Sequence, residues 1–464
     1  MSPKMKSPQS PKTKAEGAGQ DGLDDYKTLE NQFYEALLLL NAMKCMQNEC
    51  GKPHESQTLE KERLRKFLRG LAYFCDFKKG GDTYTSIGLE ETESAFTFWV
   101  ASNKHRPELA DFLRDLLGRL KGLKDAPEAI KGDLRRNLQE MCFTKAAKRI
   151  LQYKSHLSKS VEQAQLILAK PKTQNDEILS LWMSGLIKAD SKDNLELCDS
   201  IFAASKQVHM LRLLRSRAKL ERSLQRIRDK RNAFDEVRHY IGRLASHTRT
   251  HNQLCDVVED QLIGEIIHAP VVCQIVPENA TTEFTYDSES RLERLLVGIK
   301  DDAERRQVKS RLGHLEKKPW EIYKRIPEQY SNFKPRVHAE VQILEHFYKN
   351  NLKFAKNDKY VGGSKPSCEC CYLYFKYHPA RMVLPESSHK VFIHWGLPPV
   401  ANRDEGYSEF VQQREILSNM VNALIRDTIS ETLDCRIAPC FRPDSSTELS
   451  TTIMSFRSME PDGV

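Results

Sequence analysis

One histidine, one glutamate and two cysteines are the residues of this sequence whose types and spacing could carry metal chemistry. The segment 335–344 reads PRVHAEVQIL and supplies His338 and Glu340, and the segment 364–371 reads SKPSCECC and supplies Cys368 and Cys371. Zinc in proteins accepts imidazole and thiolate ligands, and three of them leave the fourth tetrahedral position open. Catalytic zinc sites have such an open position, whereas structural sites are closed. We therefore expect a catalytic zinc site here.

Each of these residues is expected near the start of a helix. In HAEVQILEHFY the apolar residues recur on one helical face, with His338 at the first position. Cys368 and Cys371 are three residues apart at the start of a second helix, so their sulfurs share a face. The partial positive charge of a helix N-terminus favours the thiolate form that binds metal. Glu340 can reach the open position without ligating, and a carboxylate there can relay a proton.

A closed structural site is the alternative, because a single C-x-x-C pair is common in proteins. His346 lies about 12 Å further along the helix than His338, so both cannot bind the same ion. Cys370 lies between the paired cysteines in sequence and points away from the face that they share, which indicates a core thiol. Neither residue supplies a fourth ligand, which favours the open site.

The sequence H-A-E followed by P-x-C-x-x-C resembles the signature of the zinc-dependent cytidine deaminase superfamily. The stretches VHAEVQIL, YVGGSKPSCECCY and SHKVFIHWGLP more closely resemble a deaminase-like branch abundant in filamentous fungi, often called OTT-type deaminases. The resemblance covers 330–400 and extends loosely to 266. It implies that His338, Cys368 and Cys371 bind Zn²⁺ and that Glu340 shuttles the proton.

The chain departs from the superfamily pattern at Ser367, because most members have Pro directly before the first Cys. The fungal branch shares this feature, so the resemblance still implies an intact site with an altered backbone beside it. Further candidates for substrate contact are Gly363 and Ser364 in the pocket floor, His389, and Trp395, which could stack on a base. A core position is the alternative for Trp395, given the apolar area that it buries.

The predicted fold class is α+α/β, with a large irregular helical N-terminal region followed by a small α/β, cytidine deaminase-like zinc domain. Apolar residues recur at helical spacing up to His268, and β-rich PVVCQIVP follows Ala269. We expect further short strands at 281–286, 359–363 and 389–395. The predicted domains are a disordered tail at 1–25, a helical domain at 26–268, the zinc domain at 269–400 with its core at 330–400, and a C-terminal helix and loose tail at 401–464.

The net charge of +8 is concentrated in the segment 206–249, where Lys and Arg far outnumber Asp and Glu. Such a segment could contact RNA or DNA phosphates, and the alternative is a solvated helical face or a contact with an acidic partner. No apolar run is long enough to span a membrane, and the basic N-terminus has no hydrophobic segment of a secretory signal. The twelve cysteines lack a regular spacing, which suits a reducing compartment, so we expect a cytoplasmic or nuclear protein.

Two classes of function follow. The first is an enzyme that deaminates a nucleobase in a nucleotide or nucleic acid, with zinc-activated water as nucleophile and Glu340 as proton shuttle. The second is a catalytically silent interaction scaffold whose deaminase-like module keeps a structural zinc. Glu340 favours the enzyme, because a purely structural zinc does not need a carboxylate at that position.

Overall fold

The computed structural model divides the chain into two compact units. The first unit comprises 1–42, 283–334 and 399–434, and the second comprises 43–282, 335–398 and 435–464. All the predicted site residues belong to the second unit. The described residues are 15–43, 58–104, 106–169, 173–188, 193–225, 232–277, 299, 301–315, 334–400, 403 and 407–434.

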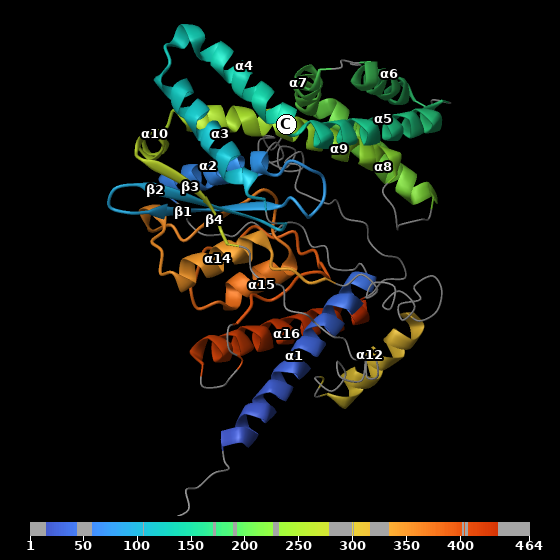
Figure 1. Ribbon diagram of the computed structural model, residues 1–464. Coiled ribbons are helices and arrows are strands. Elements are labelled where there is room, and N and C mark those ends of the chain that lie inside the picture. The colour runs from blue at the N-terminus through green and yellow to red at the C-terminus, as the bar shows by residue number, and fades with distance from the viewer. Residues whose placement is uncertain are drawn as a thin grey trace, which may run out of the picture. The chain divides into compact units, whose positions relative to one another are not determined.

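The described residues are mostly helical, and a small sheet lies among the helices (Figure 1). The strands are β1 (Thr85–Glu91), β2 (Phe96–Ser102), β3 (Val271–Ile275) and β4 (Val361–Gly363). The helices up to the third strand are α1 (Ala15–Met43), α2 (Leu59–Cys75), α3 (Glu108–Asp125), α4 (Glu128–Lys145), α5 (Ala147–Leu168), α6 (Gln174–Lys188), α7 (Asn194–Ser205), α8 (Val208–Gln225), α9 (Ala233–Val257) and α10 (Gln261–His268). After it come α12 (Asp302–Leu315), α14 (Ala339–Lys349), the 3-10 helix η1 (Ala355–Asn357), α15 (Glu369–Tyr377) and α16 (Ser408–Asp434).

The sheet of the second unit joins strands that lie far apart in the sequence. Its order is β3-β2-β1-β4, with β1 antiparallel to β2 and β4, and β2 parallel to β3. Residues from Thr85 to Leu89 are all buried, so β1 is covered on both faces. In the run SIGL at its centre, Ile87 and Leu89 alternate with the small residues Ser86 and Gly88, and a Cβ atom at Gly88 would lie 2.6 Å from the Phe347 ring of α14.

Helices cover the sheet in layers. Helix α14 packs against β1 and β2 and also contacts α15, whereas α2 packs against β1 and β4, and α3 against β3. Figure 1 shows α14 and α15 on one side of the sheet and α2 with α3 on the other. The strands therefore form the middle layer of an α/β/α arrangement, and α14 is held directly beneath the hairpin of β1 and β2.

Helix α9 is the centre of the helical layer above the sheet. It packs against α2, α5, α7 and α8. A Cβ atom at Gly70 would lie 2.6 Å from Cδ2 of Leu254, so α2 and α9 approach each other closely at this glycine. One continuous hydrophobic core includes residues of α2, β1, β2, α3, α9, α10 and β3. The helices before the third strand and the sheet therefore share their core.

The first unit contains α1, α12 and α16. The Tyr26 hydroxyl donates a hydrogen bond to Gln413 Oε1 at 2.7 Å, and the Tyr26 and Phe410 rings lie 5.1 Å apart. Arg403 pairs with Glu30 within the same unit. A hydrogen bond and an aromatic contact thus join α1 to α16 across almost the full length of the chain.

The structure agrees with the predicted fold class and corrects several predicted details. The region 26–268 contains β1 and β2, and the boundary predicted after His268 falls inside the unit that shares one sheet and one core. The predicted strand at 389–395 has no ladder beyond a single bridge between Arg336 and Trp395. Helix α1 begins at Ala15, within the predicted tail at 1–25. The predicted strand at 281–286 and the predicted loose tail at the end of 401–464 lie outside the described residues.

The strands predicted at 270–277 and 359–363 are confirmed as β3 and β4. The helices predicted to begin at the site residues are confirmed as α14 and α15. Among the described residues, none of the helices combines the length and the apolar character needed to cross a membrane.

Candidate metal centre and cavity

The structure brings His338, Cys368 and Cys371 together. The Nδ1 atom of His338 lies 3.5 Å from each of the two sulfur atoms, and the sulfurs lie 3.4 Å from each other. Ligand atoms around a tetrahedral zinc, at normal bond lengths, are about 3.5–3.8 Å apart, so this triangle has the size that zinc requires. All three side chains are buried, and the described residues contain no other group of this kind close enough to hold an ion.

Helix starts position the three donor atoms. His338 and Cys368 are the N-cap residues of α14 and α15, and both have an extended backbone. The Cys371 N–H donates to Cys368 Sγ at 3.5 Å. The start of α14 is fixed from outside, because Asn103, directly after β2, accepts a hydrogen bond from Ala339 N at 2.8 Å. The hairpin of β1 and β2 thus helps to place His338.

The surroundings of Cys368 favour a metal-binding thiolate, whereas burial and the neighbouring Cys368 raise the pKa of Cys371 well above its usual value. Burial alone would raise the pKa of Cys368, but hydrogen bonds from Cys370 and Cys371 and the His338 charge lower it well below its usual value. Trp395 Nε1 donates a hydrogen bond to Cys371 Sγ at 3.2 Å. An N–H group that donates to sulfur stabilises the thiolate over the thiol.

Trp395 therefore does not have the place that the sequence predicted for a base-stacking residue. Its side chain is 0 % exposed, and it does not line the cavity beside the metal group. Trp395 instead occupies the core position that was the alternative, and its indole N–H adds a polar contact to Cys371. Because an aromatic side chain buries a large area, it can fix both the packing and the orientation of the neighbouring sulfur.

Glu340 is buried beside the three donor atoms. Its side chain is 3 % exposed, and burial raises its pKa to about 7. Its Oε2 atom has no hydrogen-bond partner among the described residues. Glu340 also lines a cavity of about 420 Å³. A buried carboxylate that titrates near neutral pH and faces a cavity is suited to accept and donate a proton there.

The cavity next to Glu340 is assembled from distant parts of the second unit. Gly363 and Ser364 line it from the end of β4, and Tyr84 lines it from the residue before β1. A Cβ atom at Gly363 would lie 2.3 Å from the Tyr84 hydroxyl oxygen, so only glycine fits there without displacing the tyrosine. Tyr84 was not singled out in the sequence, because its strand lies within the region predicted to be helical.

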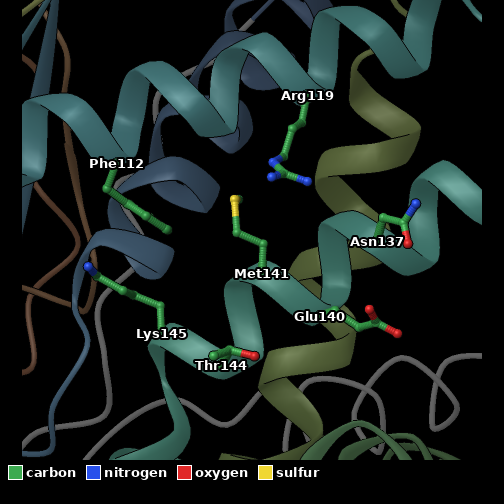
Figure 2. A pocket seen from close by; sticks show the side chains of 7 residues that line it. All are labelled: Phe112, Arg119, Asn137, Glu140, Met141, Thr144 and Lys145. Carbon is green, nitrogen blue, oxygen red and sulfur yellow. The ribbon is translucent and has the colours of Figure 1, made fainter.

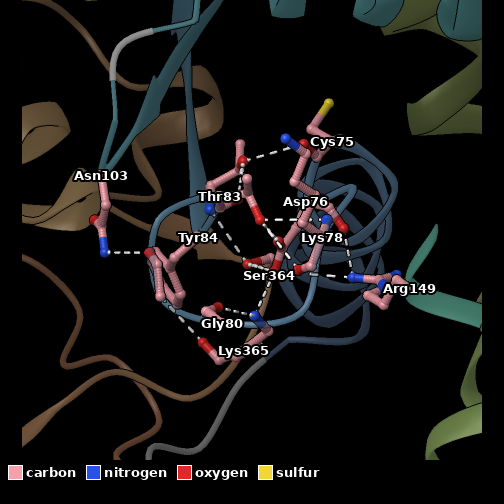
Figure 3. Close-up of polar contacts among 12 residues, drawn as sticks. Cys75, Asp76, Lys78, Gly80, Thr83, Tyr84, Asn103, Arg149, Ser364 and Lys365 are labelled. Carbon is pink, nitrogen blue, oxygen red and sulfur yellow. Dashed lines mark hydrogen bonds and ion pairs between the residues drawn. The ribbon is translucent and has the colours of Figure 1, made fainter. Parts of the chain in front are cut away.

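A polar network beneath the cavity holds its floor in place (Figure 3). Asp76 lies at its centre and accepts hydrogen bonds from Thr83 at 2.6 Å and Ser364 at 3.1 Å, and pairs with Lys365 at 2.7 Å. The Tyr84 hydroxyl donates to the carbonyl oxygen of Lys365 at 3.0 Å. Residues that follow α2 thereby fix the loop between β4 and α15, which carries Cys368 at its end.

His389 contacts Glu369, the residue after Cys368, and does not line the cavity. Its Nδ1 atom is 2.6 Å from Glu369 Oε2, and its φ of 50° places it in the left-handed region. It is not among the residues that line the cavity. The structure therefore places Gly363 and Ser364 where a substrate could contact them, and it does not place His389 or Trp395 there.

A second hollow lies between α3 and α4 (Figure 2). Its volume is about 720 Å³, and Met141 projects toward its middle between Arg119 and Lys145. No residue of 337–399 lines it. It therefore adds nothing to the metal group.

The basic segment 206–249 divides into parts with different surroundings. Arg217 pairs with Asp176 at 3.4 Å, and Arg222 pairs with Asp235 at 2.5 Å. Residues 226–231 lie outside the described residues. Arg243 and Arg249, on α9, line the same cavity as Glu340. Among the described residues of the segment, only Arg243, Ser246 and Arg249 at its end line the cavity of the candidate site.

Residues 337–399 match the family model described as OTT_1508-like deaminase. No curated protein and no solved structure gives a significant match. The matched residues contain all three donor atoms and Glu340, but they contain neither the hairpin of β1 and β2 nor the helices α2 and α9 that complete the cavity. The chain thus carries a deaminase-like domain inside a larger fold.

Proposed function

We propose that the deaminase-like domain at 337–399 makes this chain a zinc-dependent hydrolytic deaminase of a nucleobase. The observation that carries the proposal is the position of Glu340, buried at the cavity and directly beside three donor atoms of the right kind and spacing. A structural metal site needs no carboxylate with an unpartnered oxygen next to it, and a hydrolytic site does.

His338, Cys368 and Cys371 would hold the zinc ion. Their nitrogen and sulfur atoms are separated by the distances expected between tetrahedral ligands, and Trp395 donates to one of the sulfurs. Three protein ligands leave one position for water, and zinc bound in this way lowers the pKa of water and supplies a nucleophile near neutral pH.

Glu340 would move the proton. Its carboxylate takes a proton from the attacking water and passes it to the amino group that leaves as ammonia. Gly363 and Tyr84 shape the cavity wall beside it. The reaction replaces the exocyclic amine of the base by a carbonyl oxygen, which comes from the water.

The experiment is ammonia release by the zinc-loaded full chain from cytosine and adenine nucleosides, nucleotides, and single-stranded RNA and DNA. We expect release from at least one of these substrates and none after removal of zinc with a chelator. No release from any substrate by protein with full zinc would contradict the proposal. The result would then favour the interaction scaffold with a structural zinc.

A further inference from the structure

Helices α14 and α15 meet at two places along their length. The first is the candidate metal group, where His338 at the start of α14 faces Cys368 and Cys371 at the start of α15. The second lies further along both helices, where Glu345 of α14 meets Tyr374 of α15. Glu345 follows His338 by seven residues, and Tyr374 follows Cys371 by three. These spacings keep each pair on one helical face, so the same two faces are joined twice.

Glu345 is a buried carboxylate that is held from the second helix. The Tyr374 hydroxyl donates a hydrogen bond to Glu345 Oε1 at 2.7 Å, and His378 Nε2 lies 3.1 Å from the same oxygen. His378 Nδ1 accepts a hydrogen bond from Ala380 N, so in the neutral imidazole Nε2 carries the proton that faces the carboxylate. Burial alone would raise the pKa of Glu345, but its contacts with His378 and Tyr374 lower it. The carboxylate is therefore charged inside the protein.

Glu345, Tyr374 and His378, which we call the Glu345 group, take no part in the chemistry proposed above. Each of the three residues is at most 7 % exposed. None of them lines the cavity or belongs to the donor group. A buried charged pair often stabilises a fold no more than apolar side chains of the same volume, because desolvation offsets the attraction. Stability alone therefore does not explain the Glu345 group.

Trp395 connects the Glu345 group to the metal group. Its ring centroid lies 5.9 Å from that of Tyr374, with 53° between the ring planes. Its Nε1 atom donates to Cys371 Sγ at 3.2 Å, and the whole side chain is buried. The indole therefore contacts a sulfur on one side and, on the other, the tyrosine whose hydroxyl Glu345 binds. A shift of the tyrosine ring would move the N–H that donates to the sulfur.

We propose that Glu345, Tyr374 and His378 are positioning residues, which hold α14 and α15 in the arrangement that the metal group requires. Their contacts need no metal, and Tyr374 acts on the Cys371 sulfur through Trp395. The inference rests on the metal site of the proposed function and not on its substrate. Donor atoms must lie within tenths of an ångström of their required positions for a metal to bind. Donors that are held in advance bind more tightly, because less conformational freedom is lost on binding.

The test is the zinc affinity of the full-length protein, measured by competition with a chelator. Tyr374→Phe keeps the ring and removes the hydroxyl that Glu345 binds. The affinity should fall by about 2- to 10-fold, which is the contribution of one buried hydrogen bond. Glu345→Gln removes the charge and should lower the affinity at least as much. If Glu345→Gln does not fold, Tyr374→Phe keeps the test decisive, because it removes a single oxygen atom.

The matched control is Asp199→Asn. Asp199, on α7, accepts hydrogen bonds from the Thr248 hydroxyl and from Gln139 Nε2, each at 2.8 Å. It lies in the same unit and belongs neither to the cavity lining nor to the donor group. The substitution also converts a hydrogen-bonded carboxylate into an amide, so it controls for lost charge and for general destabilisation. The zinc affinity of this variant should equal that of the wild-type protein.

A double-mutant cycle with Trp395→Phe tests the route to the sulfur. If Tyr374 acts through the indole N–H, Tyr374→Phe should cause no further loss of zinc affinity in protein that already carries Trp395→Phe. Equal losses in the two backgrounds would overturn the proposed route.

Hydrogen exchange of the metal-free proteins separates positioning from a general loss of stability. Amides of α15 should exchange faster in Glu345→Gln than in the wild-type protein, whereas amides of α9 should keep their protection. Faster exchange in both helices, or an unchanged zinc affinity in both variants, would overturn the inference. Failure of the proposed function is read separately, as wild-type protein that binds zinc and releases no ammonia.

Discussion

The segment 337–399 and the helical layer of α4 to α9 contribute to one cavity in different ways. The segment uses short elements and irregular loops, and it places His338, Cys368, Cys371 and Glu340 at helix starts or in the first helical turn. The helical layer uses long helices that bury apolar side chains, and it exposes only one face of α9 to the cavity. Reactive groups thus come from the segment, and a charged wall comes from the layer.

The difference teaches that the two regions tolerate change differently. The donor atoms must stay within tenths of an ångström of their positions for a metal to bind. The polar face of α9 carries none of the donor atoms, so a substitution there leaves the donor residues themselves intact. Changes in the segment should therefore have larger effects than changes in the layer.

The largest effect is expected from Cys371→Ala. Loss of one of three protein ligands should abolish stoichiometric zinc binding and reduce deamination below detection. The matched control is Cys370→Ala, the neighbouring buried thiol, which is not part of the donor group and should keep its zinc. Metal analysis of the two purified proteins checks this prediction. Full zinc occupancy in Cys371→Ala would show that the ligand is misassigned.

A second prediction tests whether the segment 337–399 and the helical layer of α4 to α9 unfold together. Leu254 is 2 % exposed and belongs to the core shared by α9, α2 and the sheet. Leu254→Ala should lower the free energy of unfolding by about 2–5 kcal/mol and shift helix loss and zinc release together. Leu166→Ala, at a position 77 % exposed on α5, should cost less than about 0.5 kcal/mol.

The measurement is thermal unfolding followed by circular dichroism and by a zinc-sensitive dye in the same sample. Two separated transitions, with only the helical one shifted by Leu254→Ala, would show that the layer folds apart from the sheet.

A smaller effect is expected from Trp395→Phe. The substitution keeps an aromatic ring in the core and removes the N–H that donates to Cys371 Sγ at 3.2 Å. Loss of a partner of a metal ligand typically lowers metal affinity about 10- to 100-fold. Competition with a zinc chelator measures this affinity. An unchanged affinity would mean that the indole contributes packing alone.

The sequence predicted which three side chains lie together at the candidate metal group, but it did not predict what surrounds them. The donor residues were recognisable because their types are rare and their spacing is set within two short helices. Tyr84, Asn103 and Asp76 were missed because each acts through contacts with residues far away in the chain. The periodicity of apolar residues within one stretch of sequence does not reveal contacts between residues that are far apart in the chain.

The strands β1 and β2 were not predicted from the sequence, for a related reason. β1 and β2 lie between long helices, and β1 buries Thr85, Ser86 and Gly88 beside Ile87 and Leu89, so its buried faces are not marked by apolar residues alone. The domain boundary was wrong for the same reason, since the sheet pairs β2 with β3 across it. The stretch 389–395 was taken for a strand on its β-branched and aromatic residues, yet it folds as an irregular segment around the buried Trp395.

The most direct test of the central claim compares wild-type protein with Glu340→Gln at equal zinc content. Glutamine keeps the size of the side chain and cannot relay the proton, so folding and zinc should be retained. Ammonia release from the preferred substrate should fall by about 10²–10⁴-fold. Equal rates for the two proteins would contradict the account, because the carboxylate at the cavity would then play no part in the reaction.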